Sequence, residues 1–181
     1  MNKTNFFDKY FEVLSENSKK VNNKQLLLAS KLILQIKKKN KKIIVIGNGG
    51  SASIASHASI DFTKACGIRC INFNESSLLT CFSNDYGYEN WTSRALNFYA
   101  KPGDLIILIS SSGNSKNIVN AAKQAKKMKL KMINFSGFNI NNKLSKFGDV
   151  RFWVNSKKYN VVEIVHSIWI LSICDYLIKK K

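Results

Sequence analysis

Residues 42–65 read KIIVIGNGGSASIASHASIDFTKA, and this stretch decides the fold. It begins with a short apolar, β-branched run that ends at Gly47, which is typical of a buried parallel strand. A loop rich in glycine and serine follows, and the chain then enters a helical stretch for which Ser51 is a natural N-cap. The same order of apolar strand, Gly/Ser loop and helix recurs at residues 105–125, LIILISSSGNSKNIVNAAKQA. The two units together predict parallel strands joined by helices.

The rest of the chain continues this alternation of helices and strands. Apolar residues recur at helical spacing through residues 2–40, with a break indicated near Val21. We expect further strands at 68–73, 131–135 and 150–154, a mainly helical stretch with an irregular centre at 76–100, and a long apolar helix at 159–180. The expected fold is therefore α/β, a three-layer sandwich with a central parallel sheet and long N-terminal and C-terminal helices. We expect a single domain over residues 1–181, made of an N-terminal helical segment (1–40) and an α/β core with the C-terminal helix (41–181).

The composition is that of a globular protein with a strong positive charge. Lysine and arginine number 29 against 11 acidic residues, a net charge of +18, and 45% of the residues are hydrophobic. The basic runs lie at the ends of predicted elements, and no nucleic-acid-binding motif accompanies them, so we expect no nucleic-acid partner. The charge favours the attraction of small anions such as sugar phosphates. We find neither a membrane span nor a signal peptide, which predicts a cytoplasmic protein with no membrane partner and with unoxidised, mostly buried cysteines.

The two Gly/Ser loops are candidate anion-binding sites. In open α/β sheets ligands bind at the carboxyl ends of the strands, where the first N–H groups of the following helix are available to an anion. Adjacent glycines let backbone amides approach a ligand closely, and a run of serine hydroxyls at a helix start suits a phosphate monoester. The candidate ligand-binding residues are Asn48, Gly49, Gly50 and Ser51 in the first loop and Ser110, Ser111, Ser112 and Ser115 in the second.

Two other interpretations of these loops are open. The first loop also fits the dinucleotide-binding pattern G-x-G-x-x-A, and Glu75 follows the next predicted strand as that pattern requires. The serine-rich second loop favours a phosphate ester instead, because a dinucleotide fold does not need such a loop two strands later. Both loops could also be simple turns that cap helices.

Three motifs in this order resemble the sugar isomerase (SIS) family. They are GNGGSASIASH at 47–57, SNDYG at 83–87 and ISSSGNS at 109–115, and they are most similar to those of the phosphoheptose isomerases. The resemblance covers nearly the whole chain. It implies a homotetramer with active sites at the subunit interfaces. It also implies the aldose–ketose isomerisation of sedoheptulose 7-phosphate to D-glycero-D-manno-heptose 7-phosphate, for lipopolysaccharide or capsule heptose synthesis.

The resemblance also implies roles for individual residues. Asn84 and Asp85 fall where the family contacts substrate hydroxyls. The family's catalytic glutamate corresponds to Asp61, which keeps the carboxylate but is one methylene shorter. On the C-terminal helix, Glu163 and His166 match family positions, and we expect them to act with Asp61 as the acid–base groups. The family's distal catalytic histidine is replaced by Leu171.

The same positions bear on metal binding and on a rival function. Some family members bind zinc there, so the resemblance implies His57, Asp61 and Glu163 as three ligands, while Leu171 supplies none. Zinc is the one cofactor indicated, and we do not expect a full site. The rival interpretation is a non-catalytic SIS module that binds or senses a sugar phosphate, which the missing distal histidine motivates.

Overall fold

Five parallel strands form the central sheet of the computed structural model, which describes residues 4–180. The strands are β1 (Ile43–Ile46), β2 (Cys70–Asn72), β3 (Leu105–Ser110), β4 (Lys131–Ser136) and β5 (Val150–Trp153), in the spatial order β2-β1-β3-β4-β5. The order reverses between β1 and β3, which pair directly, with Ile46 opposite Leu108. Ligands of such sheets bind where the order reverses, at the carboxyl ends of the strands.

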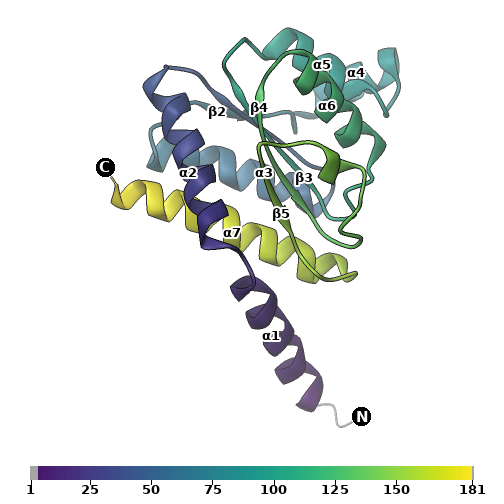
Figure 1. Cartoon of the computed structure of the whole chain (residues 1–181). Helices are drawn as coiled ribbons and strands as arrows, with labels where there is room; N and C mark the ends of the chain where they lie inside the picture. The colour runs from purple at the N-terminus through teal and green to yellow at the C-terminus, as the bar shows by residue number, and fades with distance from the viewer. Residues whose placement is uncertain (1–3, 181) are drawn as a thin grey trace.

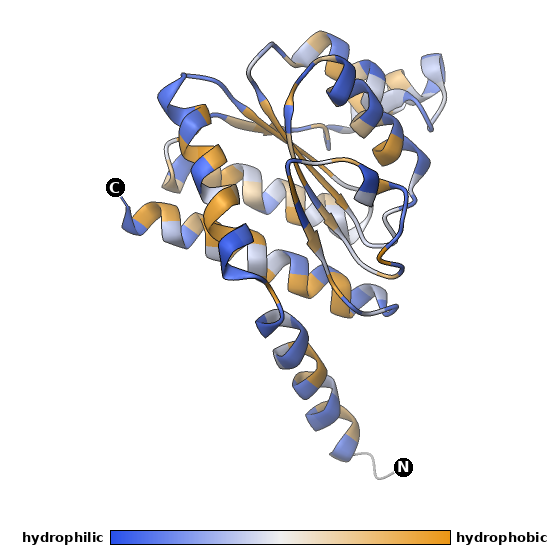
Figure 2. Cartoon of the chain, viewed as in Figure 1, coloured by the Kyte–Doolittle hydropathy of each residue, from blue (hydrophilic) through white to orange (hydrophobic). Residues whose placement is uncertain are grey.

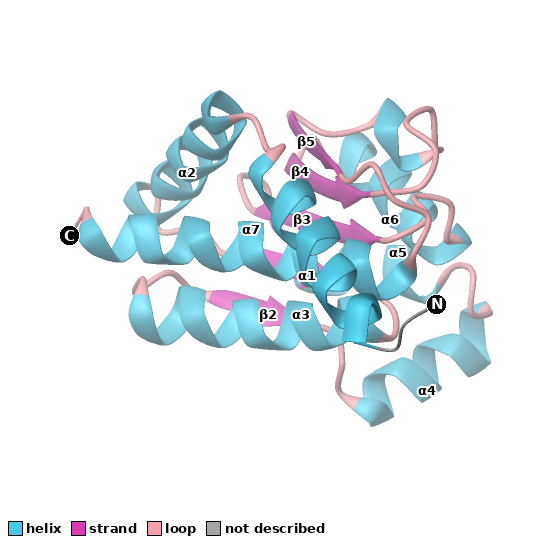
Figure 3. Cartoon of the chain, turned by 90° about the horizontal axis from the view of Figure 1, so that it is seen from below, coloured by secondary structure: helices cyan, strands magenta, loops and turns pink. Residues whose placement is uncertain are grey.

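Helices cover both faces of this sheet (Figures 1 and 3). One face carries α2 (Asn23–Lys38), α3 (Gly50–Ile60) and α7 (Tyr159–Lys179), and the other carries α5 (Trp91–Tyr99) and α6 (Lys116–Lys127). The remaining elements are α1 (Thr4–Lys19), a π-helical turn η1 (Asp61–Ala65), α4 (Ser76–Tyr86) and a 3-10 turn η2 (Leu144–Lys146). The expected three-layer α/β fold with a parallel sheet is confirmed.

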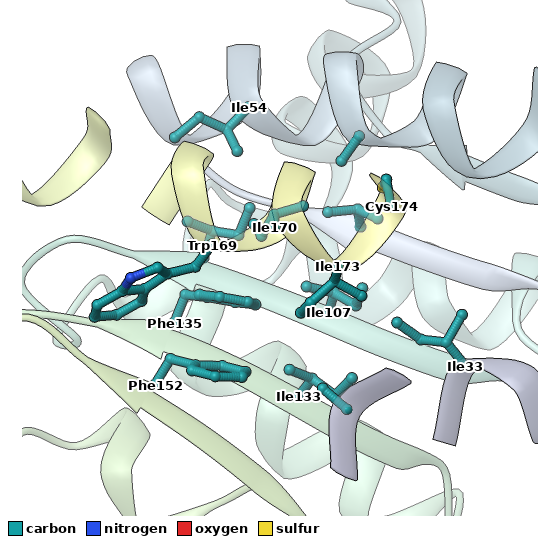
Figure 4. Close-up of a cluster of buried hydrophobic side chains, with 14 of the residues drawn as sticks. Ile33, Ile54, Ile107, Ile133, Phe135, Phe152, Trp169, Ile170, Ile173 and Cys174 are labelled. Atoms are coloured by element: carbon teal, nitrogen blue, oxygen red, sulfur yellow. The ribbon is translucent and has the colours of Figure 1, made fainter. Parts of the chain in front are cut away.

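The core forms because alternate residues of each strand point to opposite faces. Ile107 of β3 and Phe135 of β4 pack toward α7, where Phe135 stacks on Phe152 of β5 with ring centroids 4.6 Å apart (Figure 4). Ile106 of β3 packs on the opposite face with the helices α5 and α6. Both faces of the central strands are therefore buried, which explains why these strands are apolar throughout.

The C-terminal helix α7 is a core helix of the fold. It is the single helix within residues 4–180 that is long and apolar enough to cross a membrane, and half of its apolar stretch is buried inside the protein. Figure 2 shows its hydrophobic residues alongside those of the sheet. The helix α1 extends away from the body of the protein (Figure 1), and its end is held where Trp169 Nε1 donates to the Ser18 carbonyl at 2.8 Å.

The structure confirms one detail of the expected elements and corrects another. The break indicated near Val21 divides the N-terminal segment into two helices, and Asn22 caps α2 by accepting a hydrogen bond from the Lys24 amide; residues 1–3 lie outside the described part. Ser51 is not the N-cap of its helix. Gly49 takes that position with a φ of +54°, a backbone conformation that serine rarely adopts, and Ser51 lies within α3. No disulfide joins cysteines among the described residues.

Candidate functional site

The two predicted anion-binding loops lie next to each other at the carboxyl edge of the sheet. The first follows β1 and leads into α3, and the second follows β3 and leads into α6. Since β1 and β3 are paired neighbours, the loops begin at nearly the same level of the sheet. The sequence predicted this edge for both loops, and the pairing of the strands brings them together.

The serine loop, residues 110–115, is arranged around the start of α6. Ser110 and Ser111 are buried, whereas Ser112 and Ser115 are half-buried. The Ser110 hydroxyl donates to the Ser115 hydroxyl at 3.2 Å, and the Asn114 amide donates to the Ser112 hydroxyl at 3.2 Å. Ser115 is the N-cap of α6, but its side chain makes no capping hydrogen bond. The amides at this helix start are therefore not capped by Ser115 and suit an anion.

The segment of residues 139–145 packs against the serine loop and is hydrogen-bonded to it. The Leu144 amide donates to the Gly113 carbonyl at 2.9 Å, and the Lys143 amide donates to Asn114 Oδ1 at 3.0 Å. Gly113 has a φ of +66°, and any side chain there would overlap the buried Asn142. The position therefore requires glycine both for its backbone and for space.

The first loop is tied to α6 by a pair of amides that the sequence did not indicate. Asn48 Nδ2 donates to Asn117 Oδ1 at 2.9 Å, and Asn117 Nδ2 donates back to Asn48 Oδ1 at 2.9 Å. The Tyr88 hydroxyl approaches Asn48 Oδ1 at 3.5 Å from the turn between α4 and α5. In the sequence, the one feature that could have indicated a role for Asn117 was its polar side chain among the apolar residues of the buried face of α6.

Glu163 connects α7 to both loops. The Ser111 hydroxyl donates to Glu163 Oε1 at 3.3 Å, and the carboxylate lies against Gly50, where any added Cβ would overlap it. Because Gly50 has no side chain, the Glu163 carboxylate of α7 can lie against the start of α3. The structure brings together Glu163, Gly50 and Ser111, which the sequence had named separately.

His166, one turn beyond Glu163, is completely buried. Its Nε2 lies 3.0 Å from the Ser136 carbonyl oxygen, and its ring packs between Phe135 and Trp169. Burial lowers its pKa to about 4, against the opposing effect of the Ser136 carbonyl. The imidazole is therefore neutral near pH 7, with a proton on Nε2 to donate to that carbonyl. Its Nδ1 has no hydrogen-bond partner among the described residues.

Asp61 and His57 form a separate pair further along α3. His57 Nε2 lies 3.5 Å from Asp61 Oδ2, with side chains 58% and 35% exposed. Asp61 starts the π-helical turn η1, a local distortion that is frequent at functional sites. Burial raises the pKa of the Cys174 thiol, and the charge of Asp61 is a smaller cause in the same direction.

Asp61 is distant from Glu163 within one chain. The helices α3 and α7 pack side by side (Figure 3), with Gly50 at the start of α3 beside Glu163 and Asp61 directly after the last residue of α3. Positions 50 and 61 are separated by about 16 Å at about 1.5 Å per helical residue. Accordingly, no three His, Cys, Asp or Glu side chains within residues 4–180 lie close enough to bind a metal ion. The zinc ligand set His57, Asp61 and Glu163 does not assemble in one chain.

The remaining predicted site residues lie on or near α4. Asn84 Nδ2 donates to Asp85 Oδ1 at 3.0 Å, and both residues are exposed. Glu75 caps the start of α4, accepting hydrogen bonds from the Ser77 and Leu78 amides at 2.9 and 2.7 Å, which lower the pKa of its carboxyl. The dinucleotide interpretation depends on Glu75 as a ribose ligand, but in this structure its carboxylate caps α4.

Comparisons with known proteins show which family the chain belongs to. The SIS domain family model matches residues 5–137. The phosphoheptose isomerase of Sulfurimonas denitrificans is 34% identical over 181 residues, 95% of this chain and 91% of that protein, and that of a Buchnera aphidicola strain is 35% identical over 144 residues, covering 77% and 73%. A phosphoheptose isomerase structure from Neisseria gonorrhoeae matches with a TM-score of 0.87 at 26% identity, covering 96% of each chain. One from Francisella tularensis matches with a TM-score of 0.90 at 22% identity over the full length of both. The chain belongs to the SIS domain family, and the relatives described here carry the name phosphoheptose isomerase.

Proposed function

We propose that this protein is an aldose–ketose isomerase that converts sedoheptulose 7-phosphate to D-glycero-D-manno-heptose 7-phosphate. The observation that carries the proposal is the serine loop beside Glu163: Ser111 of that loop hydrogen-bonds the carboxylate. A phosphate bound by the loop and the start of α6 would hold the sugar next to a carboxylate. We place the reaction in the cytoplasm, as a supply of heptose for lipopolysaccharide or capsule.

The reaction needs groups that move protons and no external oxidant. One proton leaves C1 of the ketose and one is delivered to C2, while the C1 hydroxyl becomes the carbonyl and the C2 carbonyl becomes a hydroxyl. Asp61 and Glu163 are the accessible carboxylates of the proposed acid–base set. Proton transfer by His166 requires its buried Nδ1 to become exposed, so the proposal depends chiefly on the two carboxylates.

The separation of Asp61 from Glu163 supports a homotetramer with sites at the subunit interfaces. An apolar surface suited to subunit contact is exposed on α1, where Phe7 and Phe11 are each 62% exposed. Another lies on α7, where Ile168 is 43% exposed. In such an assembly we assign Asp61 of one subunit to the serine loop of another. Surfaces of this kind are otherwise unfavourable on a monomer.

The second candidate function is a module that binds a sugar phosphate without turning it over. Two points favour it: the resemblance to the family implies a distal histidine at the position of Leu171, and the histidine that α7 does contain, His166, is buried and neutral. Phosphate binding by the serine loop is common to both candidates. They differ in whether Asp61 and Glu163 exchange a substrate proton.

A proton-exchange assay distinguishes the two functions. The protein is incubated with sedoheptulose 7-phosphate in deuterated water, with and without a chelator, and C1 and C2 are followed by NMR. An isomerase incorporates deuterium and produces an aldose signal, and Asp61→Asn slows both strongly while substrate binding is retained. Saturable binding without exchange in the wild-type protein would refute the enzyme and support the sensor. Ser110→Ala combined with Ser112→Ala is the control that abolishes binding in either case.

A further inference from the structure

We propose that Asn117, on the first turn of α6, is a positioning residue that fixes Asn48 as a hydrogen-bond donor to the substrate. The inference rests on the proposed isomerase function and assigns a further residue to that same site. Neither the first loop nor the serine loop contains Asn117; it follows the serine loop and reaches across to Asn48 of the first loop.

Asn117 is buried, and its side chain is paired with Asn48. It is 2% exposed, and its carboxamide both donates to and accepts from Asn48 at 2.9 Å. Its backbone carbonyl accepts a hydrogen bond from Thr92 Oγ1 at 2.7 Å, which fastens this turn of α6 to α5. The side chain therefore cannot turn away from Asn48 without leaving a buried amide unpaired, which is costly.

This arrangement decides what Asn48 can offer a ligand. A carboxamide has two N–H donors and one oxygen with two lone pairs. One N–H of Asn48 is used by Asn117 Oδ1, and the oxygen is occupied by Asn117 Nδ2 and approached by the Tyr88 hydroxyl. The free capacity is one N–H, which is suited to a substrate carbonyl or hydroxyl oxygen. Without Asn117 the amide would be free to rotate and could present its oxygen instead.

The pairing also separates sugar recognition from phosphate recognition. Asn117 acts on the first loop through Asn48, whereas the groups proposed to bind phosphate are the serine hydroxyls and the amides of residues 110–115. A change at Asn117 should therefore weaken reaction of the whole substrate more than it weakens binding of inorganic phosphate. A merely structural role at the start of α6 would weaken both.

The test is a double-mutant cycle of Asn117→Ala and Asn48→Ala in the full-length protein, with sedoheptulose 7-phosphate as substrate. We expect Asn117→Ala to lower kcat/KM by about tenfold or more, the effect of one or two hydrogen bonds, with the dissociation constant of inorganic phosphate unchanged within about twofold. In the Asn48→Ala background the second substitution should cause no further loss. The matched control is Asn120→Ala, one turn along α6, whose side chain bonds the Glu89 carbonyl at 3.0 Å outside the pair.

Two results would overturn the inference. One is an equal loss of kcat/KM on substituting Asn117 in both backgrounds, and the other is a parallel loss of phosphate affinity. If Asn117→Ala does not fold, Asn117→Asp replaces it, because aspartate keeps the shape and the acceptor but loses the donor to Asn48. If the wild-type protein shows no turnover, the proposed isomerase fails separately, and the dissociation constant of sedoheptulose 7-phosphate replaces kcat/KM in the same cycle.

Discussion

Acid should destabilise this protein through His166. The side chain is 0% exposed and stays neutral in the folded protein, where burial lowers its pKa to about 4. In an unfolded chain a histidine titrates near about 6.5. The unfolded state therefore takes up a proton as the pH falls through about 6.5, while the folded state does so only near about 4, so the stability contributed by neutral His166 is lost across that window.

The size of the effect follows from the difference between the two pKa values. A gap of about 2.5 pKa units corresponds to at most about 3 kcal/mol, of which about 2 kcal/mol is lost between about pH 7 and about pH 5. The perturbation is His166→Gln, which keeps an N–H able to donate to the Ser136 carbonyl but does not titrate. The free energy of unfolding of both proteins is measured by urea denaturation from pH 7 to pH 5, at about one-unit steps.

We expect the stability advantage of the wild-type protein over His166→Gln to shrink by about 2 kcal/mol over this range. Parallel pH dependences for the two proteins would refute the reasoning, because they would mean that His166 does not titrate differently on unfolding. An NMR titration of the histidine rings provides an independent check. The chain has two histidines, so the variant His57→Gln assigns both signals.

Three further predictions concern the site and its assembly. Asp61→Asn should lower kcat by roughly 10²–10⁴-fold with little change in KM, as expected for loss of a general base; steady-state kinetics measures this, and full activity would exclude Asp61 as the base. Gly113→Ala should cost about 1–3 kcal/mol of stability and weaken phosphate binding, because the methyl group overlaps Asn142. The control is Gly103→Ala, which is also at a positive φ but lies near Lys41, and its phosphate affinity measured by calorimetry should be unchanged. Phe7→Glu combined with Phe11→Glu should reduce the sedimenting mass and abolish turnover together; a smaller but active species would contradict an interfacial site.

Local sequence patterns were sufficient for the layers of the fold. The apolar runs of β1 and β3 indicated strands buried on both faces, and the structure places them at the centre of the sheet. The Gly/Ser loops were correctly placed at the carboxyl ends of these strands. A loop that connects a strand to the next helix in the chain must begin at the carboxyl end of that strand. The N-cap at Ser51 was wrong because backbone angles, rather than side-chain type alone, decide where a helix begins.

The sequence by itself determined the α/β class, the two loops and the chemical types of the candidate groups, since these depend on residues that are close in the chain. Only the tertiary structure showed that Asn117 pairs with Asn48. It also showed that His166 is buried against Phe135 and Trp169, and that Asp61 lies far from Glu163 in one chain. Each of these depends on how α3, α6 and α7 are placed against one another. Side-chain pairing and desolvation across such distances come from packing, which local periodicity does not describe.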